Sequence, residues 1–368
     1  MIKKQQIADA ANTYRLSYAI DAYPAAFKGN RLNLLFLRDA YPIYDSHDYL
    51  KEISGLKLQE ERREYLLGSI EGWPFPTIRI EKRPDPWEIS EALFKKFHFT
   101  DQIIPAQHEI GPMLVDLAIK KDVDTVALII VDGLSYYDLP EAVDAKPCLV
   151  KGVTITDFGF RDVLGKPTIS QRFFSQGYRN QVAMTFFDKN SSPLSVDLHS
   201  TFGTSQLNRI NSIEEGIEIL NNENLLRGYV QIVAPGLDKL SHYHADRPLL
   251  QESIDRIIER LDKIFDCLST KGRKVLACLT SDHGIMWRTL TEEKTEVVGD
   301  LLPENIRHPR YIKGSLNRSY AQTVISENQS YTLLKAPFMA RPWKHSEWGV
   351  HGGISAWESI VPIIIRES

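Results

Sequence analysis

The sequence predicts an α/β domain with a mostly parallel sheet flanked by helices, preceded by a smaller, mainly helical N-terminal region. Residues 125–131 (TVALIIV) form a continuous apolar, β-branched run, as in a buried parallel strand. Residues 248–268 carry apolar side chains close to a 3.6-residue period, which is typical of an amphipathic helix. Strand and helix candidates of these kinds alternate from residue 124 onwards. The other strand candidates are residues 152–158, 181–187, 228–234, 274–280 and 359–365.

The first 120 residues show no such alternation. Residues 48–67 and 86–97 are amphipathic and are expected to be helical. The proline-punctuated segment 71–77 between them cannot belong to a long helix. We therefore predict two parts, an N-terminal region of residues 1–120 and an α/β domain of residues 121–368.

Composition limits the class of protein but does not indicate a binding partner. The 368 residues are 43% hydrophobic and 25% charged, which is enough apolar material for a sizeable core. The formal net charge of −4 gives no overall basic character that would favour nucleic-acid binding, although a local basic groove is compatible with it. The three cysteines have no CxxC spacing, and no apolar run reaches the roughly 18 residues that span a membrane. We expect a cytoplasmic protein with reduced thiols and no membrane contact.

Acidic and histidine side chains follow several of the predicted strands. Asp132 directly follows the first of them, and Asp282 and His283 follow another. Asp238 and His242 come after a third strand and a short turn. Because ligand sites in open α/β sheets form beyond the carboxyl ends of the strands, these five side chains are expected to converge.

His351, in a Gly-rich loop before the final strand, is a sixth candidate. Taken singly, each residue has an ordinary explanation, since Asp-Gly after a strand is usually a turn and an Asp-xxx-His pair is usually solvated. Together, three carboxylates and three imidazoles would form a self-repelling cluster without cations. Nitrogen and oxygen donors suit zinc, manganese or iron better than calcium. The sequence therefore predicts a divalent-metal site, with zinc favoured and manganese as the alternative.

The order of these residues resembles the alkaline phosphatase superfamily, and residues 351–362 (HGGISAWESIVP) resemble its PglZ branch, with a HGG-x-S motif followed by E-x-x-VP. The resemblance covers residues 124–368 and implies an alkaline-phosphatase-like sheet that binds two metal ions. It assigns one ion to Asp132, Asp282 and His283, and the other to Asp238, His242 and His351.

The resemblance also implies a Ser or Thr nucleophile at a helix N-terminus. Residues 167–170 (PTIS) resemble the family's P-T-x-T, which favours Ser170. Counting back from Arg172, as in sulfatase-like relatives, names Thr168 instead, and the hydroxyl that is not used would simply cap the helix. No cysteine lies near, which disfavours a Cys-derived formylglycine sulfatase. Weaker candidates for contacts with substrate are Arg172, Lys239, His244 and His345.

In function, the resemblance implies a metal-dependent phosphodiesterase or nuclease-like hydrolase in a phage-defence setting. Its substrate class would be a nucleic acid or nucleotide, and its partners would be other defence proteins. One alternative is a phosphomonoesterase or phosphotransferase that uses the same site, which cationic side chains beside the metals would favour. Another is a non-catalytic scaffold of a defence complex, which the complete set of six ligands disfavours.

Overall fold

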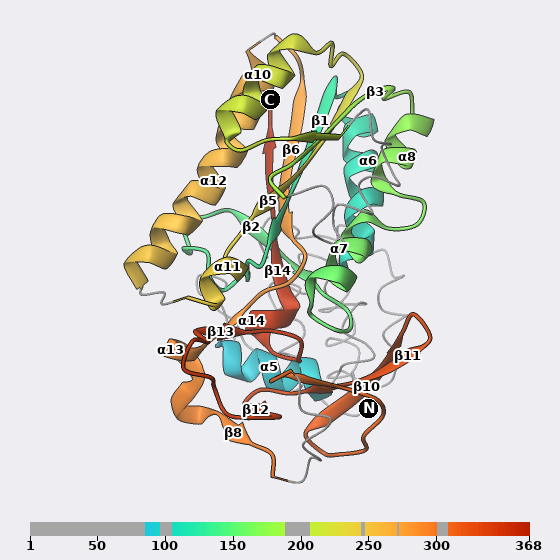
Figure 1. Cartoon of the computed structure of the whole chain (residues 1–368). Helices are drawn as coiled ribbons and strands as arrows, with labels where there is room; N and C mark the ends of the chain where they lie inside the picture. Colours follow the sequence, from blue (N-terminus) through green and yellow to red (C-terminus); the bar gives the residue numbers. More distant parts are fainter. Residues whose placement is uncertain (1–84, 96–104, 188–206, 244–246, 271, 300–307) are drawn as a thin grey trace, which may run out of the picture.

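The computed structural model describes residues 85–95, 105–187, 207–243, 247–270, 272–299 and 308–368. At its centre is a seven-stranded sheet in the order β2-β14-β6-β1-β5-β3-β4 (Figure 1). Every strand runs parallel except β14, which is antiparallel to both of its neighbours. The strands are β1 (Thr125–Asp132), β2 (Ala145–Leu149), β3 (Asn180–Thr185), β4 (Leu207–Arg209), β5 (Gly228–Pro235), β6 (Val275–Ser281) and β14 (Ile360–Glu367). The predicted α/β class with a mostly parallel sheet is confirmed.

Helices cover both faces of the sheet (Figure 1). On one side lie α6 (Ile110–Lys120), α7 (Thr156–Leu164) and α8 (Ile169–Ser175), with the short η3 (Gln107–Glu109) leading into α6. On the other side lie α10 (Ile213–Asn222) and α12 (Arg247–Ser269), and α11 (Asp238–Ser241) follows β5. Alternate residues of β1 therefore enter two different apolar clusters, Ala127 and Ile129 in one and Val126 and Leu128 in the other. This double burial explains why the strand is apolar without alternation.

Five of the six predicted strands match β1, β3, β5, β6 and β14 to within a few residues, and the predicted helix 248–268 is part of α12. The strand predicted at residues 152–158 is wrong. The chain leaves the sheet at Leu149, the end of β2, and α7 begins at Thr156. The β-branched run Val153-Thr154-Ile155-Thr156 imitates a strand locally, but β2 already occupies the position beside β14.

The helices before residue 121 pack on the α/β domain. Helix α5 (Pro86–Lys95) matches the helix predicted at residues 86–97 as far as the structure describes it, whereas the one predicted at residues 48–67 lies outside the described residues. The Trp87 ring of α5 meets the ring of Trp357, in α14 (Ala356–Ser359), edge to face at 4.8 Å. Helix α6 contributes Ile110 and Leu114 to the sheet's core. The division at residue 120 stays a prediction for the rest of the N-terminal region.

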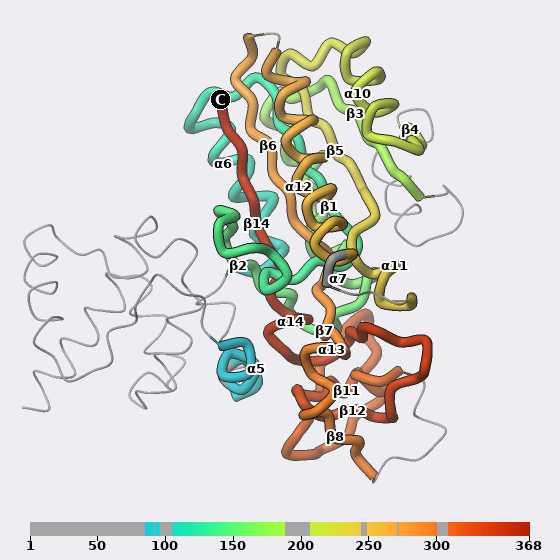
Figure 2. The backbone as a smooth tube through the Cα atoms, turned by 90° about the vertical axis from the view of Figure 1, so that its left-hand side faces the viewer, coloured from blue at the N-terminus to red at the C-terminus, as the bar shows by residue number. Residues whose placement is uncertain are grey.

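Residues 286–299 and 308–350 build a small additional layer beyond the carboxyl ends of the parallel strands (Figure 2). Its three-stranded antiparallel sheet has the order β10-β11-β9. The described elements of this layer are β7 (Met286–Trp287), α13 (Arg288–Thr291), η4 (Glu292–Lys294), β8 (Glu296–Val297), β9 (Tyr311–Lys313), β10 (Ala321–Ser326), β11 (Gln329–Leu334), β12 (Phe338–Met339) and β13 (Gly349–Val350).

A buried ion pair fastens this layer to the main sheet. Arg310 and Glu358 have fully buried side chains and approach to 2.8 Å. Arg310 also donates to the Leu334 carbonyl at 3.0 Å, and Glu358 accepts the Gly353 N–H at 2.9 Å. Loss of either partner would leave an uncompensated buried charge. The pair therefore fixes the loop that carries His351 between the two layers.

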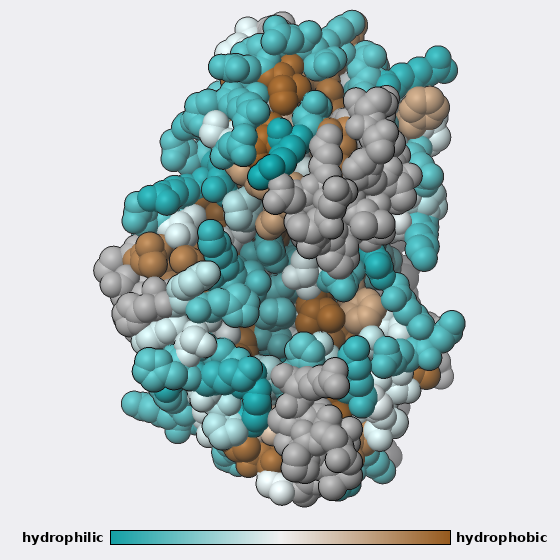
Figure 3. Space-filling view, viewed as in Figure 1, coloured by the Kyte–Doolittle hydropathy of each residue, from teal (hydrophilic) through white to brown (hydrophobic). Residues whose placement is uncertain are grey.

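None of the described helices is long and apolar enough to cross a membrane. The face of the molecule seen in Figure 3 is largely hydrophilic, and its hydrophobic side chains form small, separate groups. Scattered apolar side chains of this kind are normal on a protein surface.

Candidate active site

The carboxyl edge of the sheet gathers five of the six predicted metal ligands. Asp132 is the last residue of β1, Asp238 begins α11 just after β5, and Asp282 and His283 follow β6. His351 lies just before α14 and β14. Two groups of ligand atoms each lie within 4.8 Å of one another, with His283 common to both: Asp132, Asp282 and His283 in one, and Asp238, His283 and His351 in the other.

The first group is the set expected from the sequence. The Nε2 atom of His283 lies 3.8 Å from Asp132 Oδ1 and 3.7 Å from Asp282 Oδ2. Asp282 Oδ1 accepts the backbone N–H groups of Gly133 and His283 at 2.9 and 2.8 Å. Asp282 Oδ2 is buried and has no hydrogen-bond partner among the described residues. Such an oxygen is costly unless something binds it, which fits a cation.

The second group differs from the expected set in one member. His351 Nε2 lies 3.3 Å from Asp238 Oδ1, and the His351 ring stacks on His283 with centroids 4.2 Å apart. His242 approaches Asp238 Oδ2 only to 3.8 Å, and its side chain is 61% exposed. The structure thus brings Asp238 and His351 together as expected and leaves His242 at the outer edge of the group.

Both histidines of these groups are oriented by backbone carbonyls. His283 Nδ1 lies 3.1 Å from the Gly284 carbonyl, and His351 Nδ1 lies 2.9 Å from the Thr154 carbonyl. Because a carbonyl can only accept, each Nδ1 donates, so Nε2 is the atom that carries the lone pair when the ring is neutral, as it must be to bind a cation. Metal-ligating histidines show this arrangement, so the donor set fits zinc or manganese.

The pKa values of the two groups reflect crowded negative charge. Burial, reinforced by the charges of Asp282 and Asp238, raises the pKa of Asp132 to about 7. Burial also raises the pKa of Asp282 to about 7. Burial lowers the pKa of His283 to about 4, so this ring is neutral near pH 7. A divalent cation would relieve this cost by compensating the carboxylates.

Cation binding is expected to strengthen as pH rises. In the cation-free protein Asp132 and Asp282 hold protons below about pH 7, and a cation must displace them. The pKa of His351 adds to this, because burial alone would lower it but the hydrogen bond and charge of Asp238 raise it to about 9. Titrating the EDTA-treated protein with Mn²⁺ should give affinities that increase about tenfold or more from about pH 6 to about pH 8. An affinity independent of pH over that range would contradict these protonation states.

One hydroxyl at this site was missed by the sequence prediction. Thr156, the first residue of α7, places its Oγ1 atom 3.3 Å from Asp132 Oδ1 and 3.1 Å from His283 Nε2. It is the kind of residue expected as a nucleophile, a hydroxyl at a helix N-terminus beside candidate metal ligands. The incorrect strand at residues 152–158 concealed it. The acidic Asp157 in the first turn was a helix-start signal that could have revealed it.

The structure does not bring the expected nucleophile Ser170 to this cluster. Its hydroxyl donates to the side chain of Gln181, near the start of β3. Gln181 pairs with Tyr229, and Tyr229 pairs with Val126, six residues before Asp132 along β1. At about 3.3 Å per residue, the cluster lies about 20 Å away along the strand direction.

The other expected contacts also lie apart from the cluster or at its margin. Thr168 caps α8, since its Oγ1 accepts the Gln171 N–H at 3.3 Å, as in the simpler explanation given for it. Arg172 donates to the Pro167 carbonyl at 3.0 Å. Lys239 and His345 are exposed, Lys239 next to Asp238 on α11. His244 lies outside the described residues.

A family comparison identifies the domain. The family model of the BREX system PglZ alkaline phosphatase-like domain matches residues 178–365, just over half of the chain. The chain belongs to the PglZ family. The match includes Asp238, Asp282, His283 and His351 but begins after Asp132 and Thr156. The PglZ resemblance expected from residues 351–362 is therefore confirmed, and with it an alkaline phosphatase-like domain.

Solved structures similar to the PglZ chain have low sequence identity to it. An inactive variant of murine ectonucleotide pyrophosphatase/phosphodiesterase 5, in complex with AMP, is 12% identical with a TM-score of 0.43, over 65% of this chain and 87% of that one. The periplasmic domain of phosphoethanolamine transferase EptC from Campylobacter jejuni is 11% identical (TM-score 0.35), over 67% and 80%. The corresponding Escherichia coli domain, in complex with zinc, is 11% identical (TM-score 0.33), over 45% and 64%. No curated protein sequence matches the chain.

Helix α7 reaches the PglZ site only because residue 159 is glycine. A Cβ atom on Gly159 would lie 1.9 Å from the Asp282 carbonyl oxygen. Gly159→Ala is therefore expected to destabilise the protein by about 1–3 kcal/mol through overpacking, although alanine is the better helix former by about 1 kcal/mol. Urea denaturation would measure this, with Gly216→Ala in α10 as the control. Around Gly216 the nearest atoms are side-chain ends at 3.2–3.3 Å, which can move. Equal stabilities of the two variants would contradict the tight contact.

Thr154 links the candidate nucleophile to His351. Its hydroxyl donates to the Gly353 carbonyl at 3.1 Å and accepts the Gly352 N–H at 2.8 Å. Its carbonyl accepts from His351 Nδ1, and Thr156 follows two residues later. Thr154, which is buried, thus positions both the start of α7 and the loop that carries His351.

Thr154→Val, which keeps the shape but not the hydroxyl, is expected to lower Mn²⁺ affinity and kcat about 10- to 100-fold, the usual effect of losing an outer-shell partner. Thr154→Ser keeps the hydrogen bonds and should retain most of both. Calorimetry and steady-state kinetics would measure the two variants side by side. If the serine variant lost as much as the valine variant, the methyl group rather than the hydroxyl would be what matters.

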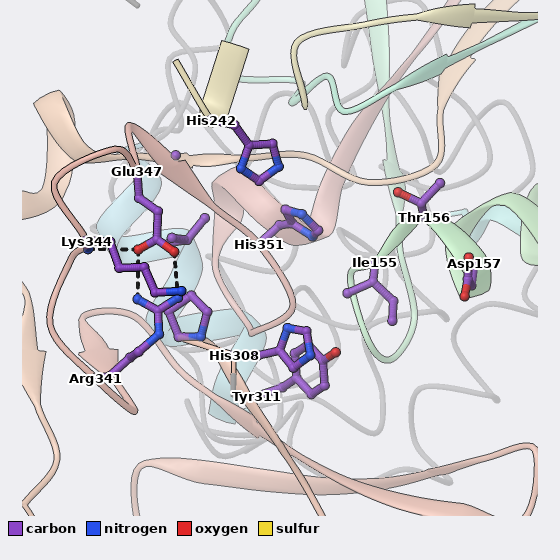
Figure 4. Close-up of a pocket in the computed structure, with 13 residues that line it drawn as sticks. Ile155, Thr156, Asp157, His242, His308, Tyr311, Arg341, Lys344, Glu347 and His351 are labelled. Atoms are coloured by element: carbon purple, nitrogen blue, oxygen red, sulfur yellow. Dashed lines mark hydrogen bonds and ion pairs between the residues drawn. The ribbon is translucent and has the colours of Figure 1, made fainter. Parts of the chain in front are cut away.

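A pocket of about 500 Å³ opens beside Thr156 and His351. It lies between the carboxyl edge of the sheet and the additional layer (Figure 4). Pockets of this size bind small molecules or parts of larger ones. The residues that line it are Ile155, Thr156, Asp157, His242, His308, Pro309, Tyr311, Arg341, Lys344, Glu347, Gly349, Val350 and His351.

Proposed function

We propose that this PglZ chain is a phosphoric diester hydrolase that depends on two divalent cations and uses Thr156 as its nucleophile. One observation carries the proposal: the Thr156 hydroxyl lies within 3.3 Å of both Asp132 and His283, at the start of a helix. The alkaline phosphatase-like domain of the family supports phosphoric ester chemistry in general.

Each residue of the site has a role in this proposal. Asp132, Asp282 and His283 would hold one cation, and Asp238 and His351 would hold the other. Bound divalent cations make a hydroxyl more acidic and compensate the charge of phosphoryl oxygens. Asp132 accepts the hydrogen bond of Thr156 and so orients its oxygen. The hydroxyl proton passes to Asp132, the oxygen attacks phosphorus as the bond to the first alcohol breaks, and that alcohol leaves with a proton from solvent. The phosphothreonine formed still carries the second substituent, and water then hydrolyses it to release a phosphate monoester.

The pocket favours a diester over a monoester. Its volume of about 500 Å³ beside Thr156 leaves room for a second ester substituent. Arg341, the arginine that could capture a terminal dianion, already makes hydrogen bonds of 2.8 and 2.6 Å to Glu347. A phosphomonoesterase or phosphotransferase is the alternative that uses the same residues.

The test is hydrolysis of bis(p-nitrophenyl) phosphate beside p-nitrophenyl phosphate. The protein is stripped with EDTA and reloaded with Zn²⁺ or Mn²⁺ before each assay. We expect cation-dependent release of p-nitrophenolate, faster from the diester. Faster release from the monoester would favour the alternative. Absence of turnover with both, despite bound cations, would favour the non-catalytic scaffold.

We also propose that the enzyme acts in phage defence, on a nucleic acid or nucleotide, together with other defence proteins. The support is the name of its family, which refers to the BREX system. Plaque assays of cells that carry the complete defence system would test this. Phage resistance should be lost when Thr156→Val replaces the natural chain.

A further inference from the structure

The pocket beside Thr156 has two unlike walls. Arg341, Lys344 and Glu347 lie on one side, and Ile155, Thr156 and Asp157 lie on the opposite side (Figure 4). Arg341 and Glu347 neutralise each other through their paired hydrogen bonds. In the described part of the chain, the Lys344 ammonium forms no ion pair. Arg341, Lys344 and Glu347 therefore give the first wall a net positive charge, although Lys344 also interacts electrostatically with Glu347, and the second wall includes the acidic Asp157.

His308 forms the part of the pocket next to these charges. Its ring stacks on Tyr311 with centroids 4.2 Å apart and planes inclined by 17°. Tyr311 is only 4% exposed and belongs to the main core cluster, so it provides a fixed support. The exposed His308 ring thus borders the same space as Lys344 (Figure 4). The Lys344 ammonium can offer three charge-assisted hydrogen-bond donors to an anion in this space.

From this arrangement we infer that the pocket selects diesters whose pocket-bound substituent carries a second phosphate group, held by Lys344. The inference rests on the proposed function, because it places the reacting phosphorus at Thr156. The substituent then crosses the pocket from the wall of Thr156 to that of Lys344. Lysine binds phosphate well as a point charge. Lys344 is thus a specificity-determining residue.

Two chromogenic esters that differ in one group test this. They are the p-nitrophenyl ester of thymidine 5′-phosphate and the same ester with an added 3′-phosphate. We expect kcat/KM to be about tenfold or more higher for the 3′-phosphorylated ester, as for one charge-assisted hydrogen bond. Lys344→Met should abolish this ratio, and Lys344→Arg should keep most of it. Lys313→Met, which removes an equal charge from an exposed position outside the pocket lining, should leave the ratio unchanged.

Equal kcat/KM values for the two esters would overturn the inference and leave the proposed hydrolysis standing. A preference that Lys344→Met retains would overturn it as well. If neither ester were hydrolysed, the proposed function would be refuted, and a binding measurement would test the second-phosphate site separately. Calorimetry with Thr156→Val should then show about tenfold tighter binding of thymidine 3′,5′-bisphosphate than of thymidine 5′-monophosphate, lost on adding Lys344→Met. Equal affinities would refute the second-phosphate site.

Discussion

Thr156→Val is expected to lower kcat for diester hydrolysis about 1,000-fold or more, because valine has the shape of threonine but no oxygen to attack phosphorus. The fold should persist, since the hydroxyl contacts only the ligand side chains Asp132 and His283 in the described structure. Steady-state kinetics with bis(p-nitrophenyl) phosphate would measure the loss. Circular dichroism and Mn²⁺ titration would show that the site still forms.

The matching controls separate Thr156 from the hydroxyls that the sequence favoured. Thr156→Ser keeps an oxygen at the same place and should retain measurable turnover. Thr168→Val should retain activity, because the Thr168 hydroxyl caps α8 and forms no hydrogen bond with the described residues of the ligand cluster. If Ser170→Ala were inactive and Thr156→Val active, the nucleophile expected from residues 167–170 would be restored and the role of Thr156 refuted.

Asp282→Asn is expected to weaken cation binding at least about 100-fold and to reduce hydrolysis accordingly, because an amide is neutral and a poorer ligand than a carboxylate. The amide keeps an oxygen that can accept the N–H groups of Gly133 and His283, so the backbone should stay in place. Calorimetry with Mn²⁺ and kinetic assays would measure both effects. Unchanged affinity and rate would remove Asp282 from the site.

The stability of the same variant should depend on pH with a defined sign. Burial raises the pKa of Asp282 to about 7, well above the usual carboxyl value, so the folded state favours its protonated form. Without cations, the free energy of unfolding of the wild type therefore decreases as pH rises from about 4 through about 7, because Asp282 ionises more readily in the unfolded state. The neutral amide of the variant does not titrate, so its stability has no such decrease. In EDTA above about pH 7, thermal unfolding should show Asp282→Asn to be at least as stable as wild type. Asp255→Asn, an exposed change on α12, should not show this pH-dependent difference.

Much of the sheet could be predicted because burial on both faces leaves a direct trace in the sequence. The apolar run of β1 and the similar runs of β5 and β6 allow no alternation of polar residues, which marks them as central parallel strands. The residues just after such strands share one edge of the sheet. The convergence of Asp132, Asp238 and Asp282 therefore followed from strand ends alone, although more than 100 residues separate the first from the second.

Some features of the site depend on tertiary contacts that leave no local trace. Thr156 reaches the cluster because Gly159 lets α7 touch the carbonyl of Asp282, and nothing near residue 156 reveals this contact. The β-branched residues before Thr156 predicted a strand, but β2 already pairs with β14 at that edge of the sheet. The role of Lys344 is equally hidden, because it depends on Arg341 and Glu347 pairing with each other. Sequence patterns predict elements better than how these elements dock.

His283 belongs to both ligand groups, which limits how many cations the site can hold at once. Its Nδ1 is committed to the Gly284 carbonyl, so the ring has a single electron pair to donate, at Nε2. One pair cannot serve two ions, and a cation bound with Asp132 and Asp282 leaves its neighbour only Asp238 and His351. The exposed side chain of His242 lies 3.8 Å from Asp238 and is the side chain that could provide a further ligand for the second cation. Filling the second position would then require the His242 ring to turn towards Asp238, so the exposed edge of the site and not its buried part would decide whether a second cation is held.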